Sequence, residues 1–310
     1  MKKPLLLTFF FFAFTSAYCQ QIRFKLKDYL TFPHSRNIHG ISGMEFIPER
    51  QEWHLAGDRG QYHVFRQLHQ PSDWACQSDS VSRTGLYLEA VRYDAATDMY
   101  YFAVENDSTS YVGYRKHAMP QPGEAFDRLS LSHSMPAPST NKGIEALAIT
   151  PTYFWVAPEA GSVEEATTEN TLVHFYRYRK VGDKLVFDAE FAYDIDRNVC
   201  PGEALGGISE IIAVPGDETR LLVLERCFQN PTVTVKLYEA RVDEQARKLI
   251  KIKDKPAFDF NSLTGFRPDN LESMTWGEDS DGKKVLVLMS DDNNSKGQWT
   301  QVLWLEMQND

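Results

Sequence analysis

The feature that most constrains the fold is a motif that occurs five times along the chain. In each copy an Ile or Leu precedes Ser or Glu at the head of an apolar run, and about 16 residues later a second apolar run ends on Asp or Glu. The first marker stands at Ser42, Glu89, Glu145, Ser209 and Glu272, and the second at Asp58, Glu105, Glu159, Glu225 and Asp291. Self-similarity at intervals of several tens of residues is typical of radial or stacked repeats. It therefore determines the fold class before any local pattern does.

Short runs rich in Val, Ile, Tyr and Phe lie between the motifs, for example at residues 111–115, 172–178 and 233–242. These runs predict strands and bring each repeat to about four strands, the content of a propeller blade. The fifth repeat offers only three, but residues 22–30 alternate apolar and polar side chains. We therefore predict an all-β chain with a single five-bladed β-propeller, closed by this N-terminal strand so that no sheet edge stays open. A sixth blade within the long third and fourth repeats is the alternative, whereas a β-sandwich does not explain five equivalent strand pairs.

The first 19 residues have the layout of a secretory signal peptide. Lys2 and Lys3 precede an apolar run over residues 5–14, and small residues follow up to Cys19. An uncleaved anchor is the alternative, but the run is short for a membrane span and no later segment has 18 uninterrupted apolar residues. We expect residues 20–310 to form one secreted or periplasmic propeller domain without a membrane span.

Charge and cysteine content narrow the class of protein further. The formal net charge is −10, and it becomes −12 without residues 1–19, which hold two lysines and no acid. This excess of acid argues against nucleic-acid binding, which needs a basic surface. The remaining cysteines are Cys76, Cys200 and Cys227. Cys200 and Cys227 flank the fourth motif on one rim, so they are expected either to form a disulfide or to stay, with Cys76, as inert thiols.

In an up-and-down blade, the head of the innermost strand and the tail of its neighbour lie at the same rim. The five motifs therefore predict a ring of acids at one mouth of the central channel, where like charges repel unless a cation, arginines or raised pKa values relieve them. Three basic residues accompany them, namely Arg59, Arg226 and Lys142. Two interpretations stay open: carboxylates hold a hard cation such as Ca²⁺ while the basic residues bind an anionic substrate, or acids and bases form structural ion pairs.

Other chemistries lack a motif in this sequence. There is no G-x-S-x-G elbow, no P-loop and no H-E-x-x-H helix. The histidines of the first repeat, such as His39 and His63, have no spacing typical of metal ligands. Ser42 and Ser209 are conceivable nucleophiles, but neither has an adjacent base in the sequence, so packing of small side chains at a crowded channel is favoured.

Five segments, in this order, resemble the phytase-like family described as "esterase-like activity of phytase". They are Gly40-Ile41-Ser42-Gly43 with Gly57-Asp58-Arg59-Gly60, Leu88-Glu89-Ala90 with Val104-Glu105-Asn106, Asn141-Lys142-Gly143-Ile144-Glu145 with Pro158-Glu159, Leu224-Glu225-Arg226, and Asn270-Leu271-Glu272-Ser273 with Ser290-Asp291-Asp292-Asn293. The resemblance implies a propeller related to calcium-dependent phytases and an activity on phosphate or other esters. Those phytases have six blades, and their dense aspartate and lysine pattern is not found here.

The sequence thus leads to two hypotheses about function. In the first, a metal-assisted hydrolase of phosphoesters or other esters holds a divalent cation, expected to be Ca²⁺, with the ligands Glu89, Glu145, Glu272, Asp58 and Asp291. The general base is Glu105, Glu159 or Glu225, and the substrate-binding residues are Arg59, Arg226 and Lys142. In the second, a non-catalytic propeller binds a ligand or partner at the same mouth. We expect a monomer that binds a small anionic or ester substrate.

Overall fold

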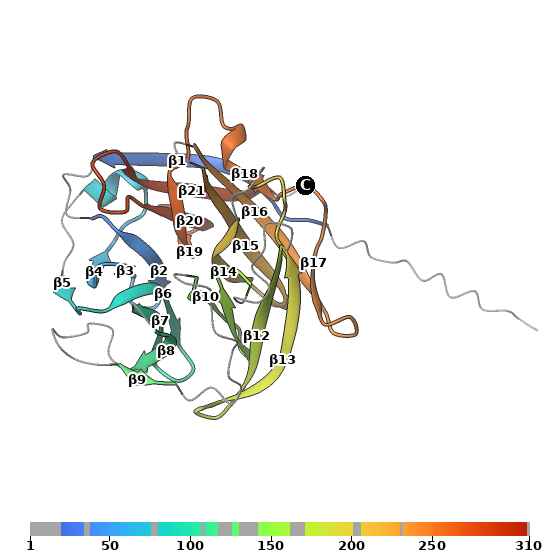
Figure 1. Ribbon diagram of the computed structural model, residues 1–310. Coiled ribbons are helices and arrows are strands. Elements are labelled where there is room, and N and C mark those ends of the chain that lie inside the picture. Colours follow the sequence, from blue (N-terminus) through green and yellow to red (C-terminus); the bar gives the residue numbers. More distant parts are fainter. Residues whose placement is uncertain are drawn as a thin grey trace, which may run out of the picture.

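The structure is a computed structural model that describes residues 20–33, 38–75, 80–106, 109–116, 126–129, 142–161, 171–200, 206–229 and 232–308. These residues fold into five blades of four antiparallel strands around one axis (Figure 1). The predicted signal peptide and Cys76 lie outside the described residues. The five-bladed β-propeller expected from the repeat count is confirmed, and no sixth blade is present in the part of the chain that the structure describes.

Each blade takes its strands in chain order from the axis outward, except that the last blade receives its outermost strand from the beginning of the chain. Blade 1 comprises β2 (Ile41–Ile47), β3 (Glu52–Gly57), β4 (Gln61–Arg66) and β5 (Ser80–Arg83). Blade 2 comprises β6 (Tyr87–Asp94), β7 (Met99–Asn106), β8 (Thr109–Arg115) and β9 (Asp127–Arg128). Blade 3 comprises β10 (Ile144–Ile149), β11 (Tyr153–Pro158), β12 (Leu172–Val181) and β13 (Lys184–Asp194). Blade 4 comprises β14 (Gly207–Val214), β15 (Asp217–Gln229), β16 (Thr232–Asp243) and β17 (Lys248–Lys251). Blade 5 comprises β19 (Asn270–Glu278), β20 (Lys284–Asp291), β21 (Trp299–Gln308) and β1 (Arg23–Pro33).

The remaining elements are small. The short strand β18 (Phe258–Asp259) pairs with β16, and the 3-10 turns are η1 (Pro71–Ala75) and η2 (Phe260–Ser262). Blades 3 and 4 are joined by a single parallel pairing between Ala192 of β13 and Lys248 of β17. Within the described ranges, no helix has the length and apolar character needed to cross a membrane.

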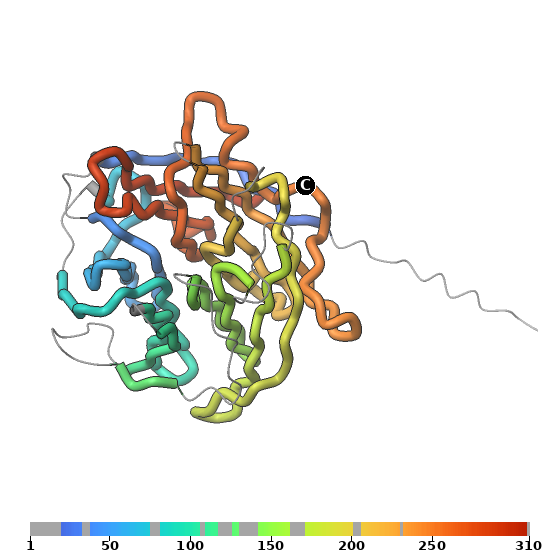
Figure 2. Tube along the Cα trace, viewed as in Figure 1, coloured from blue at the N-terminus to red at the C-terminus, as the bar shows by residue number. Residues whose placement is uncertain are grey.

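The ring closes as the N-terminal pattern predicted. β1 pairs antiparallel with β21 from Arg23 opposite Gln308 to Pro33 opposite Trp299. Figure 2 shows the blue N-terminal strand running beside the red C-terminal segment. The first and last described strands therefore complete one sheet, and the edge of β21 that faces β1 is paired.

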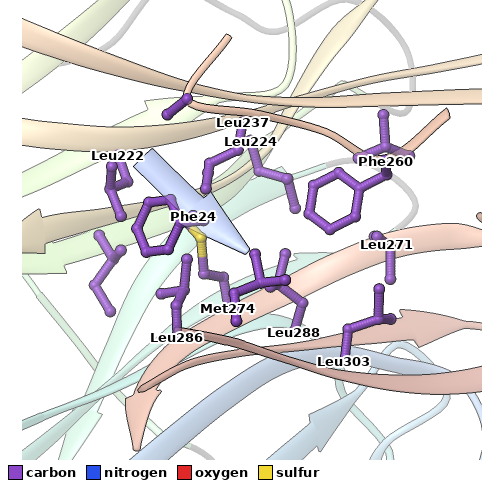
Figure 3. Packing of buried hydrophobic residues seen from close by; sticks show 14 of the residues in the cluster. Phe24, Leu222, Leu224, Leu237, Phe260, Leu271, Met274, Leu286, Leu288 and Leu303 are labelled. Atoms are coloured by element: carbon purple, nitrogen blue, oxygen red, sulfur yellow. The ribbon is translucent and has the colours of Figure 1, made fainter. Parts of the chain in front are cut away.

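The core lies between neighbouring blades, because most strands are buried on both faces. Along β7, Tyr100 and Phe102 pack against blade 1, whereas Tyr101 and Ala103 pack against blade 3. This alternation follows from the two-residue period of a strand. Between blades 4 and 5, Figure 3 shows Phe24 of β1 among leucines of both blades. The closing strand therefore contributes to the core as well as to the sheet.

A single arginine side chain crosses the channel between the inner strands. Arg92 of β6 is buried and donates hydrogen bonds to the carbonyl oxygens of Met44 (2.9 Å), Ile211 (3.0 Å) and Met274 (3.3 Å). These residues belong to β2, β14 and β19, so the guanidinium group reaches across the axis. Its Nη2 atom also lies 2.8 Å from Oε2 of the buried Glu210. Arg92 thus connects four of the five inner strands.

Candidate functional site

The five inner strands share one irregularity near their first residues. In every blade the register between the inner strand and its neighbour shifts by one residue, which leaves one residue of the inner strand without a partner. These unpaired residues are Ser42, Glu89, Glu145, Ser209 and Glu272. A β-bulge bends the strand and redirects a side chain, and bulges are common beside functional sites. The first predicted set of markers is therefore a ring of five bulges.

The strand register also defines the second set of markers. The Ile or Leu before each bulge pairs with Gly57, Val104, Pro158, Glu225 or Ser290, according to the blade. The residue that follows this partner lies beside the bulge at the mouth, and it is Asp58, Glu105, Glu159, Arg226 or Asp291. In blade 4, Arg226 therefore takes the place of an acid.

Glu225 does not belong to the ring, and its predicted position at the mouth is wrong. It lies one residue before Arg226, so the alternation of the strand turns its side chain to the opposite face of blade 4. There Glu225 is fully buried, accepts hydrogen bonds from the Tyr193 hydroxyl (2.6 Å) and the Asp196 amide (2.9 Å), and pairs with Lys251 at 2.7 Å. Burial raises the pKa of its carboxyl, although Lys251 opposes that change. Glu225 is a structural group between blades 3 and 4.

Two glycines make room for acids of the preceding blade. A Cβ atom on Gly143 would lie 2.8 Å from Oε1 of Glu105, and one on Gly207 would lie 2.7 Å from Cγ of Glu159. Glu105 and Glu159 therefore reach over the start of the next inner strand. This contact explains why small residues precede the bulges of blades 3 and 4.

The side of the ring formed by blades 3 and 4 carries two basic side chains, Lys142 and Arg226. Lys142 Nζ pairs with Glu159 Oε1. Arg226 Nη2 lies 3.5 Å from Glu159 Oε1 and 3.2 Å from Glu272 Oε1, and Arg226 also donates to the side-chain oxygen of Asn270. This side follows the interpretation in which acids and bases form ion pairs, because its basic groups already have carboxylate partners.

The opposite side, formed by blades 5, 1 and 2, holds more acid than base. Burial, followed by repulsion from neighbouring carboxylates, raises the pKa of Glu89 well above its usual range and that of Asp291 to about 9. Burial also raises the pKa values of Asp58 and Glu272, although Arg59 opposes it at the first and Arg226 at the second. Repulsion of this kind is relieved by protons or by a bound cation.

Glu145 stands between the two sides. Burial and then the charges of Glu89, Glu159 and Glu272 raise its pKa well above the usual value. Arg59, whose side chain is 54% exposed, lies 3.4 Å from Asp58 at the edge of the mouth. The ring therefore brings together ten of the eleven residues predicted for the site, and Glu225 is the exception.

The donor atoms on the acid-rich side suit a hard cation, which prefers carboxylate and carbonyl oxygens. Oδ1 of Asp58 is buried and has no hydrogen-bond partner, and both it and Oδ1 of Asp291 lie within 4 Å of the position that a Cβ on Gly40 would take. Gly40 has a φ of 64°, which favours glycine. Yet among the described residues no group of three or more His, Cys, Asp or Glu side chains is arranged to hold a metal ion. The donors fit calcium in kind, and side chains would have to close around it.

Several residues of the mouth were not among the predicted site residues. Asp292 Oδ1 accepts a hydrogen bond from the Gly40 amide at 3.1 Å, and Asn270 donates to Glu272 at 2.7 Å. Asn270 and Asp292 flank motif residues, and that adjacency was the available signal. The His39 ring lies 3.3 Å from the Gln61 amide nitrogen, and its positive charge would lower the pKa of Asp58. Nothing in the spacing of His39 pointed to this position.

The two serine bulges have different surroundings. Ser42 Oγ lies 3.3 Å from Glu272 Oε2, so this hydroxyl belongs to the polar mouth. Ser209 Oγ donates to the Leu271 carbonyl oxygen at 3.1 Å and is buried. Ser209 therefore ties blade 4 to blade 5, as a packing role predicts.

Cys200 and Cys227 form the disulfide that was one of the two sequence expectations, with their Cα atoms 5.3 Å apart. Cys227 directly follows Arg226, and the bridge packs with Val199 and Tyr238. It lies beside Arg226 in β15 and ties this part of the strand to the segment that follows blade 3.

Comparisons with known proteins agree with this architecture. The catalytic domain of a GH62 α-L-arabinofuranosidase from Coprinopsis cinerea is 13% identical, with a TM-score of 0.52, covering 92% of this chain and 97% of that chain. An endo-arabinase from Bacteroides thetaiotaomicron VPI-5482 is 11% identical, with a TM-score of 0.53, covering 90% of this chain and 98% of that chain. At such identities the likeness shows the fold alone. A search of curated protein sequences found no match.

The family comparison covers most of the propeller. Residues 36–294 match the model of the family described as "Phytase-like: Esterase-like activity of phytase". The match includes the five bulge residues and the five residues beside them at the mouth, from Ser42 to Asp291. The resemblance read from the five motifs is thereby confirmed, and the chain belongs to the phytase-like family.

Proposed function

We propose that this protein is an ester hydrolase that acts on phosphoesters at the acid-lined mouth of its propeller, with a divalent cation, Ca²⁺, as cofactor. The observation that carries the proposal is the uneven ring: basic groups gather on one side, and the other side holds more carboxylates than bases, with burial and mutual repulsion raising the pKa values of Glu89 and Asp291. Membership of the phytase-like family supports the choice of an ester substrate.

The proposed cation ligands are Asp58, Asp291, Glu272 and Glu89, with Glu145 behind them. Oδ1 of Asp58 lacks a hydrogen-bond partner, and Asp58 and Asp291 both approach Gly40, where a side chain would collide with Asp58. A divalent cation bound here would polarise the ester and neutralise negative charge as it develops. Its binding would also remove the repulsion that now favours protonated carboxyls.

The chain's own residues would orient the substrate and move the proton. Arg59, half exposed at the edge, and Arg226, on the inner side, would bind the anionic group and stabilise negative charge in the transition state. Glu105 is the preferred general base. Burial raises its pKa, while the Gly143 amide that donates to it opposes the change, and a base is most effective when its pKa approaches the working pH. Glu159 already pairs with Lys142 and Arg226, so it serves better as a positioning residue.

We also propose that the protein is exported and acts as a monomer. The layout of residues 1–19 supports export, and the disulfide between Cys200 and Cys227 fits an oxidising compartment. Mass spectrometry of the protein recovered from culture medium or periplasm tests the cleavage, and light scattering after gel filtration tests the oligomeric state.

The test of the activity is hydrolysis of a panel of phosphomonoesters, phosphodiesters and carboxylic esters, in EDTA and with Ca²⁺, Mg²⁺, Mn²⁺ or Zn²⁺. We expect cation-dependent phosphoester turnover that falls at least about 100-fold in Glu105→Gln, the range lost with a general base. Glu49→Gln, an exposed acid in a turn of blade 1, is the matched control. Binding of Ca²⁺ without turnover of any ester would favour the non-catalytic ligand-binding propeller instead.

A further inference from the structure

A groove lies between blades 4 and 5 on the same rim as the acid ring. Its volume is about 540 Å³, and its walls include Phe228, Val233, Arg267, Gln298 and Trp299. Phe228 and Trp299 are 52% and 50% exposed, although large aromatic side chains usually bury more of their surface. The groove thus presents two aromatic side chains to solvent, with polar groups beside them.

Strand geometry places this groove next to the ring. Phe228 follows Arg226 by two residues on β15, so the two side chains lie on the same face of the strand, about 7 Å apart along it. Val233, the cross-strand partner of Phe228, lines the groove as well. Because Arg226 reaches Asn270 of blade 5, Phe228 faces the same gap between the blades.

Hydrogen bonds hold the other wall in place. Asp269 accepts hydrogen bonds from the Trp299 amide (2.8 Å) and from the Gln298 side chain (2.9 Å). The Trp299 carbonyl oxygen accepts one from the Ser290 hydroxyl at 2.8 Å, and Ser290 directly precedes Asp291 of the ring. Trp299 is therefore fixed on both sides of its backbone by residues that adjoin the ring, which holds this wall of the groove in place.

We propose that this groove is a specificity subsite that binds a flat ring of the ester substrate, with the ester group in the acid-lined mouth. The occupant has an apolar face to lie against Phe228 and Trp299, as an aryl group or the face of a sugar ring does, and a polar edge that faces Gln298. This inference rests on the proposed ester hydrolysis and names the class of substrate within it.

The test compares esters with and without a ring on three forms of the full protein. Phenyl phosphate, 2-naphthyl phosphate and glucose 1-phosphate are measured against ethyl phosphate on the wild type, Trp299→Ala and Trp299→Phe. Aryl alcohols leave more readily than ethanol, so the readout is the change that each substitution causes. For at least one ring-bearing ester, we expect Trp299→Ala to lower kcat/KM relative to ethyl phosphate by about tenfold, the scale of one aromatic stacking contact. Trp299→Phe should cause little change, and ethyl phosphate should react equally in all three. A Trp299-dependent loss largest for the naphthyl ester indicates an aryl occupant, and one largest for glucose 1-phosphate indicates a sugar.

Binding measured by tryptophan fluorescence separates this inference from the proposed hydrolysis. Quenching by 2-naphthyl phosphate that Trp299→Ala weakens, without turnover of any ester, would support the groove and refute the hydrolysis. Turnover with the same ring preference in wild type and Trp299→Ala would overturn the groove and leave the hydrolysis in place. The absence of both quenching and turnover would refute both.

Discussion

Replacement of Asp291 by Asn tests the central claim about the ring, that its carboxyls repel one another when no cation is bound. Burial and the charges of Glu272 and Asp58 raise the pKa of Asp291 from 3.8 to about 9. The folded protein therefore holds a proton on Asp291 at pH values where the unfolded chain has lost it. A carboxyl whose pKa is higher in the folded state contributes most to stability below its unfolded pKa, near pH 4. That contribution is lost as the pH rises from 4 through 9.

The size of the effect follows from the slope of this dependence. While the folded state holds one more proton than the unfolded state, the free energy of unfolding falls by about 1.4 kcal/mol per pH unit. From pH 7 to 8.5, Asp291 alone should therefore lower it by about 2 kcal/mol. Burial lowers the pKa values of His54 and His63 to about 4, so these two histidines make the fold more stable as the pH rises towards 6.5. The range from pH 7 to 8.5 lies above their titration.

The assay is urea unfolding in EDTA at pH 7, 7.5, 8 and 8.5, for the wild type, Asp291→Asn and the exposed turn variant Asp183→Asn. We expect the wild type and Asp183→Asn to lose stability in parallel, and Asp291→Asn to lose about 2 kcal/mol less across the range. Excess Ca²⁺ should flatten the wild-type curve, because a ligand of the ionised ring stabilises the folded state. Parallel curves for all three proteins in EDTA would refute the account of the ring.

Three further perturbations test other parts of the structure. Arg92→Met should lower the free energy of unfolding by about 3–5 kcal/mol, because it leaves buried Glu210 unpaired; a loss below about 1 kcal/mol in urea unfolding would contradict the bridging role. Replacing Cys200 and Cys227 together by Ser should cost about 3.5 kcal/mol, the loop entropy for their separation of 27 residues; thermal unfolding with and without reductant checks this value, and the variant should no longer respond to reductant. Gly207→Ala should displace Glu159 and reduce kcat/KM by roughly 10–100-fold, because Glu159 positions Arg226 in the proposed site. Asp183→Asn, in an exposed turn away from the mouth, should leave the rate unchanged.

The architecture could be predicted from sequence because each blade repeats the same pattern, a pair of apolar inner strands with polar residues at one end. The five motifs correspond to five inner strand pairs, and the alternation over residues 22–30 correctly indicated the closing strand. The additional length of the third and fourth repeats, which left a sixth blade open, goes partly into long strands such as β15 and β16. Repeat length alone does not distinguish longer strands from additional ones.

The site was predicted in outline, and its error has a physical cause. Alignment by residue type matched Glu225 with the acids of the other blades, whereas the register of β14 and β15 matches Arg226 with them. A shift of one residue exchanges the two faces of a strand. The side chain of Glu225 therefore lies at the interface of blades 3 and 4, not at the mouth. Arg92 was missed for a related reason: one charged residue in an apolar run carries no sign that it will meet carbonyl oxygens of three other blades.

The pairing of β1 with β21 has a consequence for how the chain is made. The partner of Arg23 is Gln308, so roughly 270 residues must be synthesised after β1 before its partner strand exists, which takes about 15 to 60 seconds at typical rates of translation. Throughout that interval Phe24 has no blade 5 core to enter, and the apolar face of β1 remains exposed. Biogenesis of this propeller must therefore keep its first strand unpaired and protected from aggregation until the last one arrives.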